Sequence, residues 1–376
     1  MTGVILALNA GSSSLKFAVA TPEDISSRLM SGTIERIGSS EARLSHTNSD
    51  GQKRKLELGL VDHRAALRLL FAEVETSGAG LSVEGVGHRI VHGGSTFTDP
   101  VIITDEIVEQ IEELVPLAPL HQPHGILGIL TARDAYPKAI HVACFDSAFH
   151  ARKPWIHDAY ALPRQFYDQG LRRYGFHGLA CESICSTLTK EGFPLADRKI
   201  VIAHLGNGCS VTAVDCGKAA ATSMGFSTLD GLTMGTRCGG IDPGVLIHLM
   251  REGRSLNDLE KLLYHGSGLL GLSDFSNDMR DLFADDRRES REAIDFFVAR
   301  LCEEICRMVG TMGGLHNIVF SGGIGENSAH IRDRVSRKLE CLPGLNGDGV
   351  EIMVRSADEE RQLIATTIFL GLERPS

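Results

Sequence analysis

Three basic side chains stand beside glycines at widely separated places in the chain. Arg89 lies in the run GHRIVHGG, His177 in RRYGFHG and Arg237 in MGTRCGG. Core packing explains an arginine between glycines poorly, whereas its planar fork suits a carboxylate or a phosphate. The pattern favours recognition of a small anion. For each residue taken singly, the alternative is a surface ion pair or a structural histidine.

Acidic and histidine residues add further candidates. Asp146 directly follows the apolar run Ile140–Phe145, the usual position of a functional carboxylate in an α/β fold, although a helix N-cap is equally compatible. Glu359 lies in an acidic run that is also typical of a solvated helix start. His121 and His124 have a spacing that zinc sites use, but no cysteine or acidic ligand flanks them, so zinc is disfavoured.

Two segments share one strand–turn–strand plan. Residues Val4–Ala20 and Ile200–Val214 each run from an apolar strand through a glycine turn into a second strand. The turns carry Asn9 and Gly11 in one case and Gly206–Gly208 in the other. Such turns let backbone N–H groups approach an anion closely. The pair predicts duplicated domains that hold one polyphosphate.

A third glycine cluster, Gly322–Asn327, follows the predicted strand Ile318–Phe320 and is a phosphate candidate or an ordinary strand–helix junction. The chain contains no Walker A sequence and no Asp-Phe-Gly signature of protein kinases. An ATP site in this chain would therefore need another kind of phosphate-binding loop.

Strands and helices alternate around these motifs. Thr104–Val115 predicts an amphipathic helix capped by Thr104, and Arg291–Met312 predicts a long helix that ends at a glycine pair. Residues 39–55 are polar and predict an exposed hairpin or loop. The alternation predicts an α/β fold with a mixed sheet in each half.

Composition narrows the class of protein. The chain has 376 residues, enough for two domains, with 43% hydrophobic and 23% charged residues. The formal net charge of −10 and the lack of a basic cluster argue against a nucleic-acid partner. No signal peptide or membrane span is predicted. The nine scattered cysteines, none in a Cys-x-x-Cys spacing, predict reduced thiols in the cytoplasm.

Eight short stretches together carry a resemblance to a known family. They are NAGSSSLKF from Asn9, GHRIVHGG from Gly87, APLHQP from Ala118, FDSAFH from Phe145, RRYGFHG from Arg172, HLGNG from His204, MGTRCGGIDPG from Met234 and GGIGEN from Gly322. In this order the chain closely resembles the acetate kinase (acetokinase) family, which belongs to the superfamily of acetate and sugar kinases, Hsp70 and actin.

The resemblance implies a fold of two duplicated ribonuclease-H-like (actin-like ATPase) domains with mixed sheets around a central cleft. It implies an acyl- and metal-side domain of residues 1–148 plus the returning segment 359–376, and a nucleotide-binding domain of residues 149–358. The implied reaction is reversible, Mg²⁺-dependent phosphoryl transfer from ATP to acetate, giving ADP and acetyl phosphate, with Mn²⁺ as a substitute metal. The implied protein is a cytoplasmic homodimer that serves acetyl-CoA biosynthesis.

Site residues follow from the resemblance position by position. Asp146 resembles the essential carboxylate, Arg89 and Arg237 the two anion-binding arginines, and His177 the transition-state histidine. Asn9 and Glu359 resemble the magnesium pair. The implied substrate contacts are Arg89, Val91, Leu120, His121, Phe176 and Thr228. The implied nucleotide-binding residues are His204, Leu205, Gly206, Asn207, Gly208, Asp278, Met279, Arg280, Gly323, Ile324, Gly325, Glu326 and Asn327.

Physical chemistry agrees with these roles. Acetate is already ionised at pH 7, so the reaction needs no strong general base but must offset the repulsion between two anions. Asp146 is therefore expected to orient an arginine or a metal-bound water. Thr228 stands where the family usually has a proline, which leaves a propionate or butyrate kinase as the alternative. A further alternative is an ATP-binding protein that changes conformation without acyl transfer. It is disfavoured, because the arginine and histidine turns would then have no anion to bind.

Overall fold

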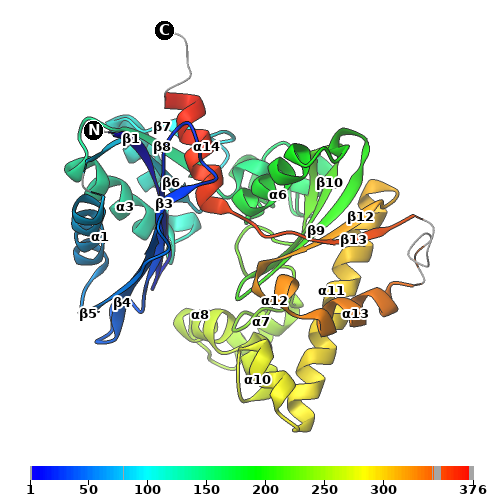
Figure 1. Cartoon of the computed structure of the whole chain (residues 1–376). Coiled ribbons are helices and arrows are strands. Elements are labelled where there is room, and N and C mark those ends of the chain that lie inside the picture. The colour runs from blue at the N-terminus through cyan, green and yellow to red at the C-terminus, as the bar shows by residue number, and fades with distance from the viewer. Residues whose placement is uncertain (1, 79, 341, 343–348, 372–376) are drawn as a thin grey trace. The chain divides into compact units, whose positions relative to one another are not determined.

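The computed structural model describes residues 2–78, 80–340, 342 and 349–371 (Figure 1). The chain divides into two compact units. Unit 1 comprises Met1–Phe149 and Asp358–Ser376, and unit 2 comprises His150–Ala357. The sequence-based division placed these boundaries after residue 148 and before residue 359.

Unit 1 is built on a mixed eight-stranded sheet of order β5-β4-β3-β2-β1-β6-β8-β7. Its strands are β1 Thr2–Ala10, β2 Leu15–Ala20, β3 Arg28–Glu35, β4 Ala42–Asn48, β5 Lys53–Gly59, β6 Leu81–Ile90, β7 Val101–Ile102 and β8 Ile140–Phe145. Its helices are α1 His63–Ser77, α2 Asp105–Glu113, α3 Gln122–Ala135 and α14 Glu359–Gly371, with a 3₁₀ turn, η1, at Val115–Leu117. A second 3₁₀ turn, η2 Ala148–His150, crosses the boundary between the units.

The two faces of this sheet follow from the alternation of side chains along a strand. Val86 of β6 packs in the core that also contains Leu67 and Leu70 of α1. Its neighbours Gly85 and Gly87 face α14 instead, where a Cβ on either residue would meet Thr367. The C-terminal helix α14 thus returns to pack on β1, β6 and β8 of unit 1.

Unit 2 contains a mixed five-stranded sheet of order β11-β10-β9-β12-β13. Its strands are β9 Lys199–Leu205, β10 Cys209–Asp215, β11 Lys218–Thr222, β12 Asn317–Ser321 and β13 Glu351–Val354. Its helices are α4 Trp155–Asp158, α5 Arg164–Asp168, α6 Gly178–Lys190, α7 Pro243–Arg251, α8 Leu256–His265, α9 Gly268–Ser273, α10 Met279–Ala284, α11 Arg288–Met312, α12 Gly322–Asn327 and α13 Ala329–Lys338, with the 3₁₀ turn η3 at Leu195–Asp197.

The two sheets repeat one topology. In unit 1, β1 pairs antiparallel with β2 and parallel with β6, and β6 pairs parallel with β8. In unit 2, β9 pairs antiparallel with β10 and parallel with β12, and β12 pairs parallel with β13. The outer strands β3 and β11 also correspond, each antiparallel to its neighbour. The predicted duplicated α/β fold is confirmed.

Local predictions are also confirmed. Thr104 caps α2, and the polar stretch 39–55 forms most of the β4–β5 hairpin. The long helix α11 begins at Arg288 rather than Arg291, and Gly313 ends it in the left-handed conformation with φ 65°. No helix in the described part of the chain is long and apolar enough to cross a membrane.

Candidate functional site

Three predicted site residues of unit 1 lie at the same edge of its sheet. Asn9 is near the end of β1, Arg89 is near the end of β6, and Asp146 directly follows β8. These strands are mutually parallel neighbours, so their carboxyl ends meet at one edge. This edge is where open α/β sheets place ligands.

Hydrogen bonds join these residues. The Arg89 guanidinium donates from Nη2 and Nε to Oδ2 of Asp146, at 2.5 Å and 3.0 Å. Arg89 Nη1 also donates to Oδ1 of Asn9 at 3.1 Å. The Asp146 carboxylate is 1% exposed. Asp146 therefore holds the Arg89 guanidinium in place through two hydrogen bonds to one carboxylate oxygen.

Helix α14 brings two more carboxylates to this group. Asn9 Nδ2 donates to Oε2 of Glu359 at 2.8 Å and to Oε1 of Glu360 at 3.2 Å. The close packing of α14 on β6 needs a glycine at position 87. A Cβ on Gly87 would lie 2.6 Å from Oγ1 of Thr367 and 2.9 Å from the Leu363 carbonyl oxygen. Glu359 is thus a partly buried member of the cluster, with 17% of its side chain exposed, and more than a solvated helix start.

The Arg89 guanidinium faces three carboxylates, those of Asp146, Glu359 and Glu360. Burial opposes the charge on Arg89, but these carboxylates more than offset that effect and raise its pKa above the ordinary value. Arg89 is therefore a permanent cation, and the carboxylates beside it are ligands of the type that divalent cations bind.

The described residues include no group of three or more His, Cys, Asp or Glu side chains arranged to hold a metal ion. Mg²⁺ does not require such a cage, because it is usually bound through one or two carboxylates together with water and substrate phosphates. The amide oxygen of Asn9 and the carboxylate of Glu359 are hard oxygen donors of this kind. The donor set fits a weakly coordinated Mg²⁺.

The remaining predicted substrate contacts of unit 1 are Val91, Leu120 and His121, and the first two differ in how far they are exposed. Val91 is buried, whereas Leu120 is 43% exposed. His121 directly precedes α3. His124, the second member of the disfavoured zinc pair, stacks on His63 with ring centroids 4.1 Å apart. His63 in turn donates to the Gly11 carbonyl oxygen at 3.1 Å, in the turn after Asn9.

His177 lies at the centre of the predicted site in unit 2. It occupies the N-cap position of α6 with a left-handed backbone, φ 60°. Its Nδ1 is 3.0 Å from the hydroxyl of the buried Ser210, and its ring lies 5.0 Å from that of His204. A Cβ on Gly208 would lie only 3.2 Å from Nε2 of His177. Glycine at 208 thus leaves room for the imidazole beside the turn.

Arg237 lies at the same turn. A Cβ on Gly208 would lie 3.9 Å from Nη1 of Arg237. The same Nη1 donates to the Thr228 carbonyl oxygen at 3.4 Å. Phe176 is buried, and Thr228 is partly exposed. The predicted arginine and histidine of unit 2 therefore converge on one glycine turn.

The three predicted nucleotide-binding stretches also converge in unit 2. Ser321 pairs with His204 in the sheet, and a Cβ on Gly206 would lie 3.9 Å from the Gly323 amide nitrogen. The amide of Gly235 donates to the Asn207 carbonyl oxygen at 3.3 Å. A Cβ on Gly235 would contact Asn277, which precedes Asp278, the cap of α10. Gly322–Asn327 is indeed a strand–helix junction, and it adjoins the turn after β9.

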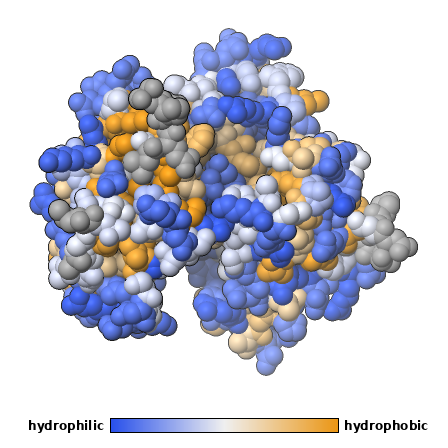
Figure 2. Space-filling view, turned by 45° about the horizontal axis from the view of Figure 1, so that its top comes forward, coloured by the Kyte–Doolittle hydropathy of each residue, from blue (hydrophilic) through white to orange (hydrophobic). Residues whose placement is uncertain are grey.

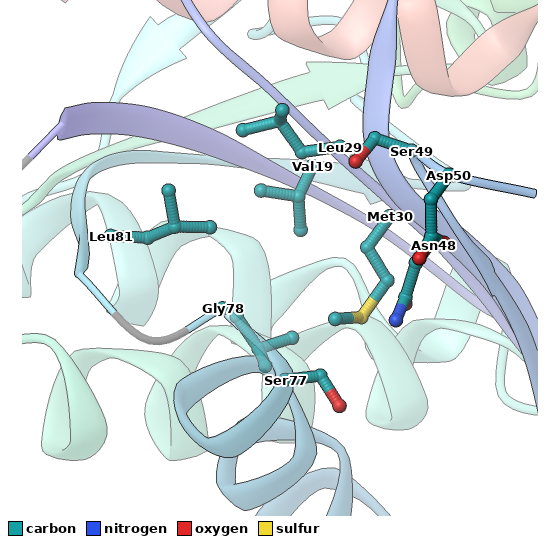
Figure 3. Close-up of a pocket in the computed structure, with 10 residues that line it drawn as sticks. Val19, Leu29, Met30, Asn48, Ser49, Asp50, Ser77, Gly78 and Leu81 are labelled. Atoms are coloured by element: carbon teal, nitrogen blue, oxygen red, sulfur yellow. The ribbon is translucent and has the colours of Figure 1, made fainter. Parts of the chain in front are cut away.

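A separate pocket of ≈ 280 Å³ lies in unit 1 near the end of α1 (Figure 3). Val19, Leu29, Met30 and Leu81 are among its apolar residues, and Asn48 and Ser77 are among its polar residues. None of the predicted site residues lines this pocket. The pocket therefore does not define the catalytic site.

Sequence reasoning missed two partners in these clusters. Glu360 hydrogen-bonds Asn9 alongside Glu359, and Ser210 contacts His177. Ser210 follows the Gly206–Gly208 turn by two residues, so strand alternation could have placed it beside Gly208. For Glu360 the only signal was its place in the acidic run.

Comparisons with known proteins identify the family of the chain. Residues 4–367 match the model of the acetokinase family. An acetate kinase of Methylocella silvestris is 45% identical over 365 residues, covering 94% of this chain and 89% of the relative. An acetate kinase of Oceanobacillus iheyensis is 41% identical over 393 residues, covering 98% of each chain.

Solved structures give the same result. A propionate kinase from Francisella tularensis superposes with a TM-score of 0.90 at 33% identity, covering 98% of this chain and 100% of that one. An acetate kinase from Porphyromonas gingivalis superposes with a TM-score of 0.86 at 32% identity, with the same coverage. With the family match spanning both units and all the predicted site residues, the chain belongs to the acetokinase family.

Proposed function

We propose that this protein is an acetate kinase, which transfers the γ-phosphoryl group of ATP to acetate and forms ADP and acetyl phosphate reversibly. The observation that carries the proposal is the convergence of His177 and Arg237 on the Gly206–Gly208 turn. A histidine and an arginine beside an accessible turn suit the oxygens of a phosphoryl group in transfer.

The chemistry demands charge stabilisation and alignment rather than proton abstraction. Acetate is ionised at neutral pH, so its oxygen attacks without a base. Arg89, held by Asp146 and permanently charged, is proposed to bind the acetate or phosphoryl oxygens. Asp146 is proposed to orient Arg89 through its Oδ2 atom and is not proposed to remove a proton.

His177 is proposed to donate a hydrogen bond to the phosphoryl group in the transition state. If the Ser210 hydroxyl donates to Nδ1, Nε2 carries the proton and faces the Gly208 side. The N-terminus of the thirteen-residue helix α6 begins directly after His177 and adds favourable potential for an anion. Arg237 is proposed to share the developing charge.

Asn9 and Glu359 are proposed to hold Mg²⁺, in part through water, with Mn²⁺ able to substitute. The bound ion would neutralise phosphate charge during transfer. The support is the hydrogen-bonded group of hard oxygen donors formed by the Asn9 amide and the Glu359 and Glu360 carboxylates. The nucleotide itself is assigned to His204–Gly208, Asp278–Arg280 and Gly323–Asn327, which adjoin one another in unit 2.

Acyl contacts are proposed for Val91, Leu120 and His121 of unit 1 and for Phe176 and Thr228 of unit 2. The resemblance to a propionate kinase from Francisella tularensis keeps propionate as the second candidate substrate. Hydroxylamine trapping of the acyl phosphate, with acetate, propionate and butyrate compared, tests both. Absence of ATP-dependent hydroxamate from all three acids would refute the proposed activity.

A homodimer is proposed through the face of α7. No residue of α7 is buried, and Val245, Ile247 and Met250 are 41%, 50% and 60% exposed. Figure 2 shows hydrophobic patches between hydrophilic areas on one face of the molecule, whereas the exposure of α7 is given by the fractions above. An apolar helix face of this kind suits a second copy of the chain. We also propose a cytoplasmic location, because the eight described cysteines are thiols and not disulfides.

Sedimentation of Ile247→Asp tests the dimer. The variant is expected to sediment as a monomer, whereas Leu60→Asp, at a 76% exposed position in unit 1, is expected to stay dimeric. A dimeric Ile247→Asp would place the interface elsewhere.

A further inference from the structure

A buried ion pair lies behind the loop that carries His177. Lys153 and Asp158 are each 7% exposed, and Lys153 Nζ lies 2.6 Å from Oδ1 of Asp158. Neither residue belongs to the site proposed above. A buried ammonium is costly unless its hydrogen-bonding capacity is used, so its remaining contacts indicate what the pair does.

Those contacts are main-chain carbonyls on both sides of the loop. Lys153 Nζ donates to the carbonyl oxygens of His150 at 3.1 Å and Tyr174 at 3.4 Å. With Asp158 as the third acceptor, all three ammonium protons have a partner. Asp158 is also linked to the loop directly, because its carbonyl oxygen accepts from the Arg173 amide at 2.7 Å.

His150 extends this support to the residue before His177. Its Nε2 lies 3.0 Å from the Phe176 carbonyl oxygen, which can only accept, so Nε2 carries the proton. Burial, together with the charge of Lys153, lowers the pKa of His150 to about 3, so the ring is neutral at physiological pH. The main chain is thus tied at Tyr174 and at Phe176, on either side of Gly175.

The opposite side of the loop is held as well. The amides of Tyr174 and Gly175 both donate to the Gly225 carbonyl oxygen, at 3.0 Å and 3.2 Å. His177 itself has a left-handed backbone, which is unfavourable for a residue with a side chain and persists only where the surroundings enforce it. The hydrogen bonds on both sides of the loop oppose its relaxation to a less strained backbone.

We propose that Lys153, through its ion pair with Asp158 and together with His150, is a positioning residue that fixes the His177 imidazole for phosphoryl transfer. This inference rests on the role proposed above for His177. Lys153 does not reach the substrate; it acts through the carbonyl oxygens of the loop. Loss of the ammonium is expected to let the loop relax and the imidazole move away from its position beside Gly208.

The test begins with Lys153→Met, which keeps the length of the side chain and removes its donors. Asp158 then retains the Tyr167 hydroxyl at 2.8 Å and Arg172 at 3.8 Å, so the variant leaves no isolated buried charge. We expect kcat to fall about 10- to 100-fold, because small misplacements of a catalytic group cost rates of this order. KM for ATP is expected to stay within about twofold. Lys190→Met, the same change at an exposed position on α6, should be neutral.

A double-mutant comparison separates positioning from a general structural effect. If Lys153 acts through His177, Lys153→Met should not lower further the residual rate of His177→Ala. An equal fractional loss in both backgrounds would overturn the inference. A wild-type rate for the single variant Lys153→Met, with His177 intact, would also overturn the inference.

A conservative pair at His150 covers the case in which Lys153→Met does not fold. His150→Gln places an amide N–H near the position of Nε2 and should keep kcat within about threefold, whereas His150→Leu should lose about tenfold or more. Equal rates for Gln and Leu would overturn the inference. A fully active His177→Ala would instead refute the proposed role of His177 itself, and with it the inference, so the two failures are distinguishable.

Discussion

Asn9 Nδ2 donates to Oε2 of Glu359 across 2.8 Å, although 350 positions separate the two residues in the chain. The contact joins the first strand to the last helix of unit 1 and completes a group of oxygen donors around Asn9. It gives a structural reason for the return of the C-terminal segment to the first unit. The same amide also contacts Glu360, at 3.2 Å.

Glu359→Ala should raise the concentration of Mg²⁺ needed for half-maximal rate, because one of two proposed oxygen donors is lost. An increase of about tenfold or more is expected from removing a ligand or its support. Glu360→Ala, with the longer contact to Asn9, should have the smaller effect. Titration of the rate with MgCl₂ at fixed ATP measures both. A larger shift for Glu360→Ala would transfer the metal role to that residue.

Arg89→Ala should lower kcat by about 10² or more, because a cation aligned by Asp146 stabilises charge that develops in transfer. Arg237→Ala should have an effect of similar size. Circular dichroism checks that each variant folds. If kcat stays at the wild-type value and only KM for acetate rises, these arginines bind the ground state and the charge-stabilising role is wrong.

Gly87→Ala should destabilise the protein and weaken its use of Mg²⁺ together. The added Cβ would lie 2.6 Å from Oγ1 of Thr367, so α14 must shift and carry Glu359 with it. Overpacking of this kind costs about 1–3 kcal/mol.

Gly128→Ala in α3 is the matched control for Gly87→Ala. Nothing lies within 4 Å of its added Cβ, and alanine in a helix interior gains about 0.5–1 kcal/mol over glycine. Thermal melts and Mg²⁺ titrations of the pair test the coupling. A destabilised Gly87→Ala with unchanged Mg²⁺ dependence would separate α14 packing from the metal site.

The sequence indicates the strand ends but not every partner at them. Arg89 and Asp146 could be placed because each adjoins an apolar run, and the repeat of strands around Gly11 and Gly206–Gly208 predicts the duplicated fold. The Asn9–Glu359 contact depends on how closely α14 packs, which local pattern does not determine.

Lys153 carries no local signal at all. Lysine beside Arg152 in a turn resembles any surface pair, and its burial follows only from the way the loop and α4 enclose it. Long-range packing of this kind is invisible to hydrophobic periodicity.

Stability should fall as pH drops below about 6.5, the ordinary pKa of histidine in an unfolded chain. Burial, with the neighbouring His141 as a second cause, holds the pKa of His88 well below that value, and burial lowers the pKa of His92 to about 4. His150 has a pKa of about 3 for the reason given above. Each ring is neutral when folded and takes up a proton on unfolding, so stability is fully present above pH 6.5 and decreases below it.

Urea unfolding at pH 6.5 and 5.5 measures this effect. A loss on the order of 1–3 kcal/mol is expected over that interval, above the range in which ordinary carboxylates titrate. Unchanged or greater stability at pH 5.5 would mean that these buried histidines are protonated in the folded protein.

Acyl-chain preference is the final prediction, and it depends on Thr228. Its carbonyl oxygen accepts from Arg237, so the main chain here is tied to the proposed phosphoryl site. A hydroxyl facing a longer apolar chain would be buried at a cost of about 1–3 kcal/mol. Each additional methylene gains roughly 1 kcal/mol only where space exists for it.

We therefore expect acetate to be the best substrate, propionate to lie within about tenfold in kcat/KM, and butyrate to be poor. Thr228→Pro should change the propionate-to-acetate ratio by less than about tenfold. The hydroxylamine assay with all three acids measures these ratios, and a kcat/KM for butyrate above that for acetate would replace the acetate assignment with a longer-chain kinase.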